Sequence, residues 1–241
     1  MSRALKQAVI VAAGLGRRLK PHTDDRPKAL IEINGTSMIR NSIDIMLGGG
    51  IEEIIVVVGY KKEMMEEHLR DYPVQFAHNP FYAITNNMAS LWFAAPLLKG
   101  GFLYAHSDLV YDPSLMNSVV NSQYENALLV EEKRCGEEEM KVIANDGLLV
   151  ESSKLLDPNY CVGEWTGIAR FSHKFSLTLM TRIEELLEAG HLQEYDTFAL
   201  TQLAQQGESI HIIGFNDQPW MEIDTVEDLQ AARELFGDSA P

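Results

Sequence analysis

Short apolar runs rich in β-branched residues alternate with helix-period segments through the first half of the chain, and this alternation restricts the fold most. Strands are expected at residues 7–13, 51–58, 102–106 and 127–130, and helices at 37–47, 62–69, 87–98 and 113–120. Strands separated by helices form parallel βαβ units with right-handed crossovers. The continuous β-branched run at 54–58 suits a strand buried on both faces. We therefore expect an α/β fold, with a Rossmann-like, mostly parallel sheet flanked by helices.

The second half changes character. A hairpin is expected from 140–144 and 148–151 around the tight turn Asn145-Asp146-Gly147. Further strands are expected at 167–171 and 209–213, and helices at 174–188, 196–206 and 225–235, the last with Thr225 and Asp228 close to a capping box. These patterns predict one domain over 1–241 with a small added β-layer. The change of character divides the domain into two halves, at about 1–125 and about 126–241.

Composition excludes several classes of protein. The 241 residues are 46% hydrophobic and contain no apolar run near the roughly 20 residues that span a bilayer. The net charge of −15 disfavours nucleic acid as a partner, because phosphate backbones require extended positive surface. Two cysteines are too few for a disulfide framework, and the short apolar start does not resemble a signal peptide. A cytoplasmic enzyme without a membrane partner is expected.

Positive charge is concentrated in one short loop. Residues 17–28 hold five basic and two acidic residues, in a chain that is otherwise acidic. The loop follows the first expected strand and contains Gly14 and Gly16, which allow the backbone to turn sharply and approach phosphate oxygens. Arg18 and Lys28 are suited to neutralise a triphosphate. The loop is neither a Walker loop nor a full dinucleotide-binding fingerprint. We expect it to bind a small polyanionic ligand.

The segment Gly14-x-Gly16-x-Arg18-Leu19-x-Pro21-x-Thr23, followed by Pro27-Lys28-x-Leu30, resembles the signature of the sugar-phosphate and choline-phosphate nucleotidyltransferases. The resemblance implies the nucleotide-diphospho-sugar transferase type of fold, with a nucleotide-binding half at about 1–125 and an acceptor-binding half at about 126–241. It assigns nucleotide binding to the loop backbone at Ala12, Ala13, Gly14 and Gly16. It assigns phosphate contacts and catalysis to Arg18 and Lys28.

Two carboxylates are candidates for a metal site. Asp108 follows the strand expected at 102–106, and a carboxylate at the carboxyl end of a parallel strand sits where α/β sheets bind ligands. Asp224 lies in Glu222-Ile223-Asp224-Thr225. The same resemblance pairs Asp108 with Asp224 as ligands of Mg²⁺. An anionic phosphate or phosphonate that attacks the α-phosphorus of a nucleotide requires no general base, so we interpret His106 as a strand residue.

Further segments indicate the base and the acceptor. Asn86-Asn87-Met88-Ala89-Ser90-Leu91 is similar to a segment of the choline-phosphate cytidylyltransferases, which favours CTP and makes Asn87 and Ser90 candidate base contacts. Acids and aromatic rings in the second half suit a cationic head group. The candidate acceptor-binding residues are Lys154, Glu164, Trp165, Tyr195, Asp196 and Trp220. Phosphocholine and 2-aminoethylphosphonate both remain open as acceptors, with a slight preference for the phosphonate because two carboxylates suit a hydrogen-bonding ammonium.

Two other functions remain open from the sequence. One is a sugar-1-phosphate nucleotidyltransferase, and the other is a non-catalytic nucleotide-binding module. The second is disfavoured because a relic would be expected to lose Lys28 or a metal carboxylate, and this chain retains both. The resemblance also implies that a homodimer is an expected assembly.

Overall fold

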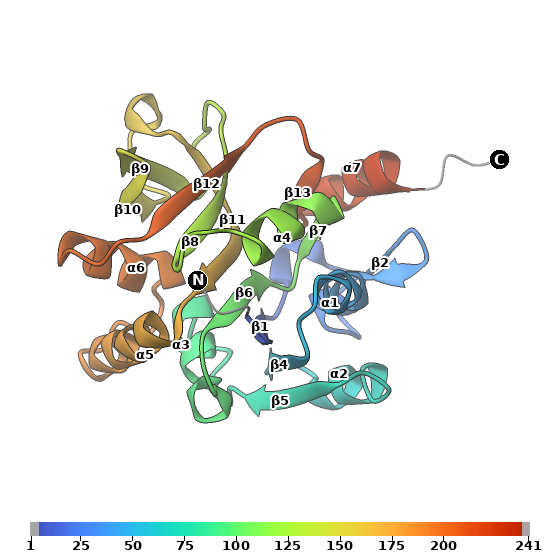
Figure 1. The fold of residues 1–241 in the computed structure, drawn as a ribbon. Helices are drawn as coiled ribbons and strands as arrows, with labels where there is room; N and C mark the ends of the chain where they lie inside the picture. The colour runs from blue at the N-terminus through green and yellow to red at the C-terminus, as the bar shows by residue number, and fades with distance from the viewer. Residues whose placement is uncertain (1–4, 238–241) are drawn as a thin grey trace.

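One large sheet contains strands from both halves of the chain in the computed structural model, which describes residues 5–237 (Figure 1). Its strands are β1 (Gln7–Ala12), β4 (Glu53–Val58), β5 (Val74–His78), β6 (Phe102–His106), β8 (Ala127–Glu131), β9 (Lys141–Asn145), β10 (Leu148–Ser153), β11 (Gly163–Phe171) and β12 (His211–Phe215). Their order is β5-β4-β1-β6-β11-β8-β12-β10-β9. Two small sheets pair β2 (Glu32–Ile33) with β3 (Thr36–Ser37) and β7 (Leu109–Tyr111) with β13 (Trp220–Glu222).

The sheet is parallel on one side and mixed on the other. Strands β5, β4, β1 and β6 run parallel to one another, whereas β11 is antiparallel to both β6 and β8. The predicted hairpin of β9 and β10 is present, and it extends the large sheet through β12. The Rossmann-like α/β fold is confirmed, and the antiparallel strands from the second half continue the sheet that the parallel strands begin.

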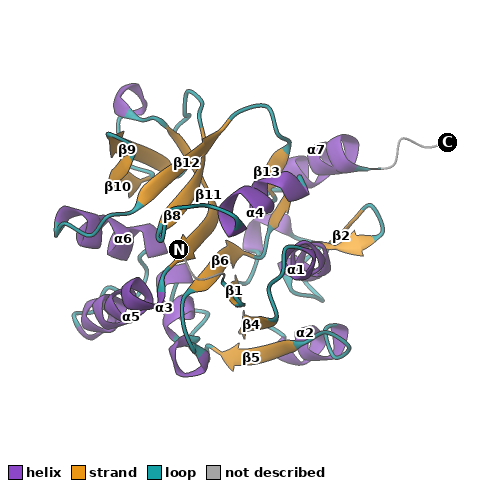
Figure 2. Ribbon diagram, viewed as in Figure 1, coloured by secondary structure: helices purple, strands orange, loops and turns teal. Residues whose placement is uncertain are grey.

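Helices cover both faces of the sheet (Figure 2). They are α1 (Met38–Gly48), α2 (Lys62–His68), α3 (Asn87–Trp92), α4 (Pro113–Val120), α5 (His173–Glu188), α6 (Asp196–Gln205) and α7 (Val226–Phe236). One core packs α1, α2 and α4 against alternate strand residues such as Ile10 and Val56. The other packs α3, α5 and α6 against the intervening residues, such as Val9 and Val57. Each central strand is therefore buried on both faces, as its continuous apolar run predicts.

Short connections account for most differences from the expected elements. Helix α3 ends at Trp92, and a separate 3-10 turn, Ala95–Leu97, follows it, because Pro96 has no N–H to continue the helical ladder. Strand β5 was not expected; it is an edge strand whose residues are half-buried or exposed except for the buried Ala77. At the last helix the capping box is confirmed. Asp228 N donates to Thr225 Oγ1 at 3.2 Å, and Thr225 N donates to Asp228 Oδ2 at 2.7 Å.

Among residues 5–237, no helix combines the length and the apolar character that crossing a membrane requires.

Candidate active site

The glycine loop leaves the carboxyl end of β1 and folds back on itself. Gly16 has φ +58°, and a Cβ there would lie 3.0 Å from Cβ of Lys28 and 3.1 Å from Cγ2 of Thr23. Thr23 Oγ1 donates to the carbonyl of Gly16 at 2.8 Å, which closes the loop. A Cβ on Gly14 would meet no described protein atom within 4 Å. Glycine is thus required by the fold at position 16, whereas position 14 has open space beside it.

Strand pairing brings the two predicted metal carboxylates together. β1 and β6 are parallel, with Val11 opposite His106, so Asp108 lies beside the glycine loop at the same edge of the sheet. β7 and β13 then pair antiparallel, with Leu109 opposite Glu222. Ile223 N donates to the carbonyl of Asp108 at 2.9 Å. The segment that carries Asp224 is therefore held against the segment that carries Asp108.

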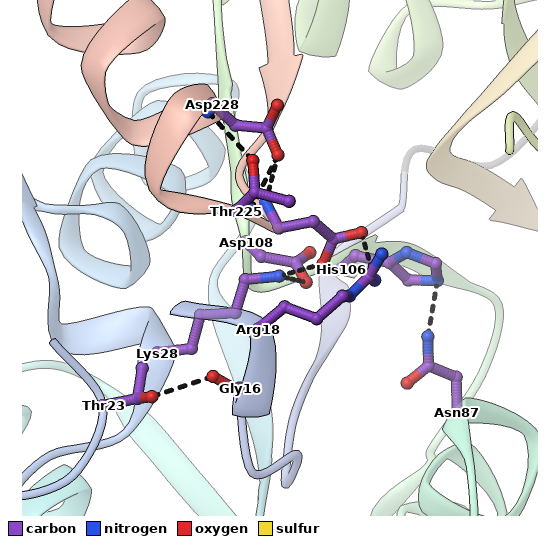
Figure 3. A network of polar contacts seen from close by, with 10 residues as sticks. Gly16, Arg18, Thr23, Lys28, Asn87, His106, Asp108, Thr225 and Asp228 are labelled. Carbon is purple, nitrogen blue, oxygen red and sulfur yellow. Dashed lines mark hydrogen bonds and ion pairs between the residues drawn. The ribbon is translucent and has the colours of Figure 1, made fainter. Parts of the chain in front are cut away.

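Lys28 lies between these two carboxylates, and Figure 3 shows its ammonium directed at Asp108. Its Nζ is 2.7 Å from Asp108 Oδ2 and 2.7 Å from Asp224 Oδ1, and its side chain is only 11% exposed. Arg18 Nη2 contacts the other oxygen, Asp224 Oδ2, at 2.5 Å. Burial alone would lower the pKa of Lys28, but the charges of Asp108 and Asp224 raise it. Two cationic side chains thus share two carboxylates at the mouth of the glycine loop.

His106, at the end of β6, belongs to a buried polar network. Its Nε2 is 3.0 Å from Asp196 Oδ2, and Tyr104 Oη donates to the same carboxylate. Burial alone would lower the pKa of His106, but Asp196 and then Asp108 and Glu222 raise it to about 9. His106 is a strand residue, as expected, and it lies at the carboxyl end of β6, two residues before Asp108.

Glu222 is a site residue that the sequence analysis did not single out. Burial, followed by the negative charges of Asp108 and Asp224, raises the pKa of its carboxyl to about 7. The spacing of Glu222 in the sequence could have indicated this position, because residues two apart in an extended chain project to the same side. Glu222 with Asp224, and His106 with Asp108, are both spaced in this way.

The glycine loop and the charged side chains around Lys28 line one cavity of about 280 Å³. The predicted site residues on its wall are Ala12, Gly14, Gly16, Arg18, Lys28, Asn87, Asp108, Lys154, Trp165, Tyr195 and Asp224. His106, Glu222, Met140 and Thr166 also line it. Asn87 Nδ2 lies 3.4 Å from His106 Nε2, as drawn in Figure 3. The predicted nucleotide and acceptor halves therefore meet at a single cavity.

The structure places five predicted site residues away from the cavity wall: Ala13, Ser90, Glu164, Asp196 and Trp220. Ser90 Oγ accepts from Asn79 Nδ2 at 3.1 Å and is 5% exposed.

The acceptor candidates among these five have protein partners. Asp196 is 2% exposed beneath His106. Glu164 pairs with Lys133 at 2.7 Å, and the Lys133 ammonium lies 5.8 Å from the ring of Trp220. Asp196, Glu164 and Trp220 therefore do not line the cavity.

The aromatic residues at the acceptor end differ in accessibility. Trp165 is 3% exposed, stacks on Tyr104 and donates its indole N–H to the carbonyl of Ile168 at 2.9 Å. Tyr195, the residue before α6, is 38% exposed. The Lys154 ammonium lies 5.6 Å from the centre of the Tyr195 ring. Tyr195 thus provides the accessible aromatic ring on this wall, and it already contacts an alkylammonium group.

Comparison with known proteins points to one family. The profile of the MobA-like NTP transferase domain matches residues 8–158. The chain is 26% identical to CTP:phosphoglutamine cytidylyltransferase of Campylobacter jejuni, over 94% of this chain and 99% of that protein. It is 42% identical to 2-aminoethylphosphonate cytidylyltransferase of Lancefieldella rimae, over 43% of each chain. The structure of CTP:phosphocholine cytidylyltransferase from Streptococcus pneumoniae superimposes with a TM-score of 0.80 at 24% identity, covering 95% of this chain and 98% of that one.

Proposed function

The chain belongs to the family of MobA-like NTP transferase domains, and on that premise we propose that it is a Mg²⁺-dependent cytidylyltransferase. It transfers CMP from CTP to a small acceptor that carries a phosphate or phosphonate and an ammonium group, and it releases pyrophosphate. 2-Aminoethylphosphonate is the preferred acceptor and phosphocholine the alternative.

The contact of one cation with both Asp108 and Asp224 carries this proposal. The ammonium of Lys28 is 2.7 Å from an oxygen of each carboxylate and acts as a stand-in for a metal ion. Carboxylate oxygens are the ligands that Mg²⁺ prefers, so the two residues fit this ion. Bound there, Mg²⁺ would supply neutralisation of the triphosphate charge next to the glycine loop.

Lys28 and Arg18 provide the remaining positive charge. Both pair with Asp224, and Lys28 pairs also with Asp108. In the transfer step these cations contact the phosphates instead and stabilise the charge that develops on the α-phosphoryl group and on the leaving pyrophosphate. The attacking phosphate or phosphonate oxygen is already anionic near neutral pH. Positioning and charge neutralisation therefore suffice, without a general base.

The glycine loop and Asn87 are proposed to hold the nucleotide. The open space beside Gly14 leaves room for phosphate oxygens to approach the backbone. Asn87 begins α3 on the cavity wall, where its amide is suited to hydrogen-bond a base edge. Cytidine is preferred because the relatives described above are cytidylyltransferases.

Lys154 and Tyr195 are proposed to hold the acceptor. Their ammonium–ring contact supports the choice of a cationic head group. When the phosphate or phosphonate of the acceptor draws Lys154 away, the ring of Tyr195 is free for the ammonium of the acceptor. Quaternary ammonium groups are commonly held by cages of several rings, whereas Trp165 is 3% exposed here. A single accessible ring favours a primary ammonium.

Turnover assays test the proposal directly. CTP, UTP, GTP and ATP are each combined with 2-aminoethylphosphonate, phosphocholine and glucose 1-phosphate, with Mg²⁺ present or chelated, and pyrophosphate release is measured. The expected result is Mg²⁺-dependent release with CTP and an amino acceptor. Turnover only with a sugar phosphate would make the protein a sugar-1-phosphate nucleotidyltransferase. Nucleotide binding without turnover of any pair would favour a non-catalytic module.

A further inference from the structure

Two connecting segments from opposite halves of the chain are joined beside the cavity. One leads from β5 to α3, and the other leads from α5 to α6. Asn86, on the cavity wall, donates to the second segment twice, from N to the carbonyl of Leu192 at 3.1 Å and from Nδ2 to the carbonyl of Gln193 at 3.2 Å. Gln193 Nε2 donates in return to the carbonyl of Ile84 at 2.7 Å. We call these three hydrogen bonds the interloop bridge.

The segment before α3 is held firmly on the nucleotide side of the bridge. The fully buried Asn79 donates from Nδ2 to Thr85 Oγ1 at 3.0 Å and to Ser90 Oγ at 3.1 Å. Asn86 caps α3, because its side-chain oxygen accepts from Asn87 N at 2.8 Å. The backbone N–H and the side-chain amide N–H of Asn86 then serve the bridge. A ligand that fixes the start of α3 therefore also fixes the donors of the bridge.

The segment between α5 and α6 has less support of its own. Residues 188–193 are all exposed. The hydrogen bond from Leu192 N is local, to the carbonyl of Gly190 at 2.9 Å. Exposed backbone with few buried contacts opens at a low free-energy cost. Tyr195 follows Gln193 by two residues, so the bridge links the position of this acceptor-side ring to the start of α3.

We propose that Gln193 is a positioning residue: through the interloop bridge, a nucleotide bound at Asn87 orders the segment that carries Tyr195 and so tightens acceptor binding. This coupling rests on the proposed function, which assigns Asn87 to the nucleotide and Tyr195 to the acceptor. Gln193 acts indirectly, since it is not among the residues on the cavity wall. A segment that the nucleotide has already ordered costs the acceptor less conformational entropy. By linkage, the acceptor tightens nucleotide binding by the same factor.

Hydrogen–deuterium exchange of the full chain tests the bridge with the nucleotide alone. CTP with Mg²⁺ should slow amide exchange in the glycine loop and also at residues 189–195, on the acceptor side. Gln193→Met has a side chain of similar length without an N–H donor. In this variant the effect at 189–195 should be lost, whereas the effect in the glycine loop should persist. Because Gln193 is exposed, the substitution leaves the core intact.

Calorimetry then measures the coupling factor. The Kd of 2-aminoethylphosphonate, and that of phosphocholine, is determined alone and with a CTP analogue that has a methylene group between the α- and β-phosphorus atoms. Gln193→Met should lower the ratio of the two Kd values about fivefold, the contribution of one hydrogen bond, and leave the Kd of the analogue alone unchanged. Gln193→Lys retains an N–H donor and should preserve the ratio. Gln75→Met, at an exposed position on β5, is the matched control.

The two regions of exchange separate the coupling from the proposed function. Slower exchange in the glycine loop with no change at 189–195 would overturn the coupling and leave the proposed function standing. Slower exchange at 189–195 that persists in Gln193→Met, or an equal Kd ratio in this variant and the unmodified protein, would exclude Gln193 as the positioning residue. No effect of CTP, UTP, GTP or ATP on the glycine loop would remove the proposed function, and the coupling with it.

Discussion

The ammonium of Lys28 lies 2.7 Å from Oδ2 of Asp108, although the two residues are 80 positions apart in the chain. Lys28 begins a 3-10 turn behind the glycine loop, and Asp108 follows β6. The same ammonium contacts Asp224. Both proposed Mg²⁺ ligands are therefore paired with the same protein cation. Metal binding between the two carboxylates requires the ammonium of Lys28 to move away from them. We expect the ammonium then to contact the phosphates of the nucleotide.

Lys28→Ala tests this exchange. Without nucleotide, the variant should bind Mg²⁺ more tightly than the unmodified protein, because the competing ammonium has been removed. With CTP and acceptor, kcat should fall about 100-fold or more, since a cation that contacts the developing charge is lost. Calorimetry with Mg²⁺ and pyrophosphate release measure the two effects. Lys20→Ala, in the same loop but paired with Asp24, is the control and should change neither. A change in KM alone would show that Lys28 only binds the nucleotide.

The two carboxylates are tested by Asp108→Asn and Asp224→Asn. Each should leave the circular dichroism spectrum unchanged and lower Mg²⁺-dependent turnover by about two orders of magnitude or more, because the metal loses a charged ligand. Asp217→Asn, at an exposed position before β13, provides the matched loss of one negative charge. Full activity in either site variant would exclude that residue from the metal site.

The two glycines of the loop should respond differently to alanine. Gly16→Ala places a Cβ at φ +58°, against Lys28 and Thr23. It should destabilise the protein by about 1–2 kcal/mol and lower kcat/KM. Gly14→Ala meets no described protein atom within 4 Å, so its melting temperature should stay within a degree or two of the unmodified protein. CTP affinity should nevertheless fall about tenfold if phosphates approach the backbone there. Unchanged CTP binding by Gly14→Ala would show that they do not.

The sequence predicts the parts of this site that depend on local pattern and sheet topology. Lys28 follows from its motif, and Asp108 from its place after a parallel strand, where carboxyl ends share one edge. Side chains whose surroundings come from distant segments are not predictable in this way. Asp196 was expected to contact a ligand, and the structure buries it against Tyr104, 92 positions away in the chain. No motif near Asp196 in the sequence indicates that its carboxylate contacts His106.

The aromatic ring at position 195 provides the test of the acceptor. Tyr195→Phe keeps the ring and should change the acceptor KM by less than twofold. Tyr195→Leu removes it and should raise that KM about fivefold or more, since a cation–ring contact contributes about 1 kcal/mol. KM for CTP should stay the same in both variants, because Tyr195 precedes α6 on the acceptor side. The comparison is made with 2-aminoethylphosphonate and phosphocholine. A larger loss with phosphocholine would indicate that the ring binds a quaternary ammonium. Equal KM values for Tyr195→Leu and the unmodified protein with both acceptors would show that the head group lies elsewhere. The acceptor KM of Lys154→Met would then show whether the phosphate or phosphonate of the acceptor binds beside Lys154.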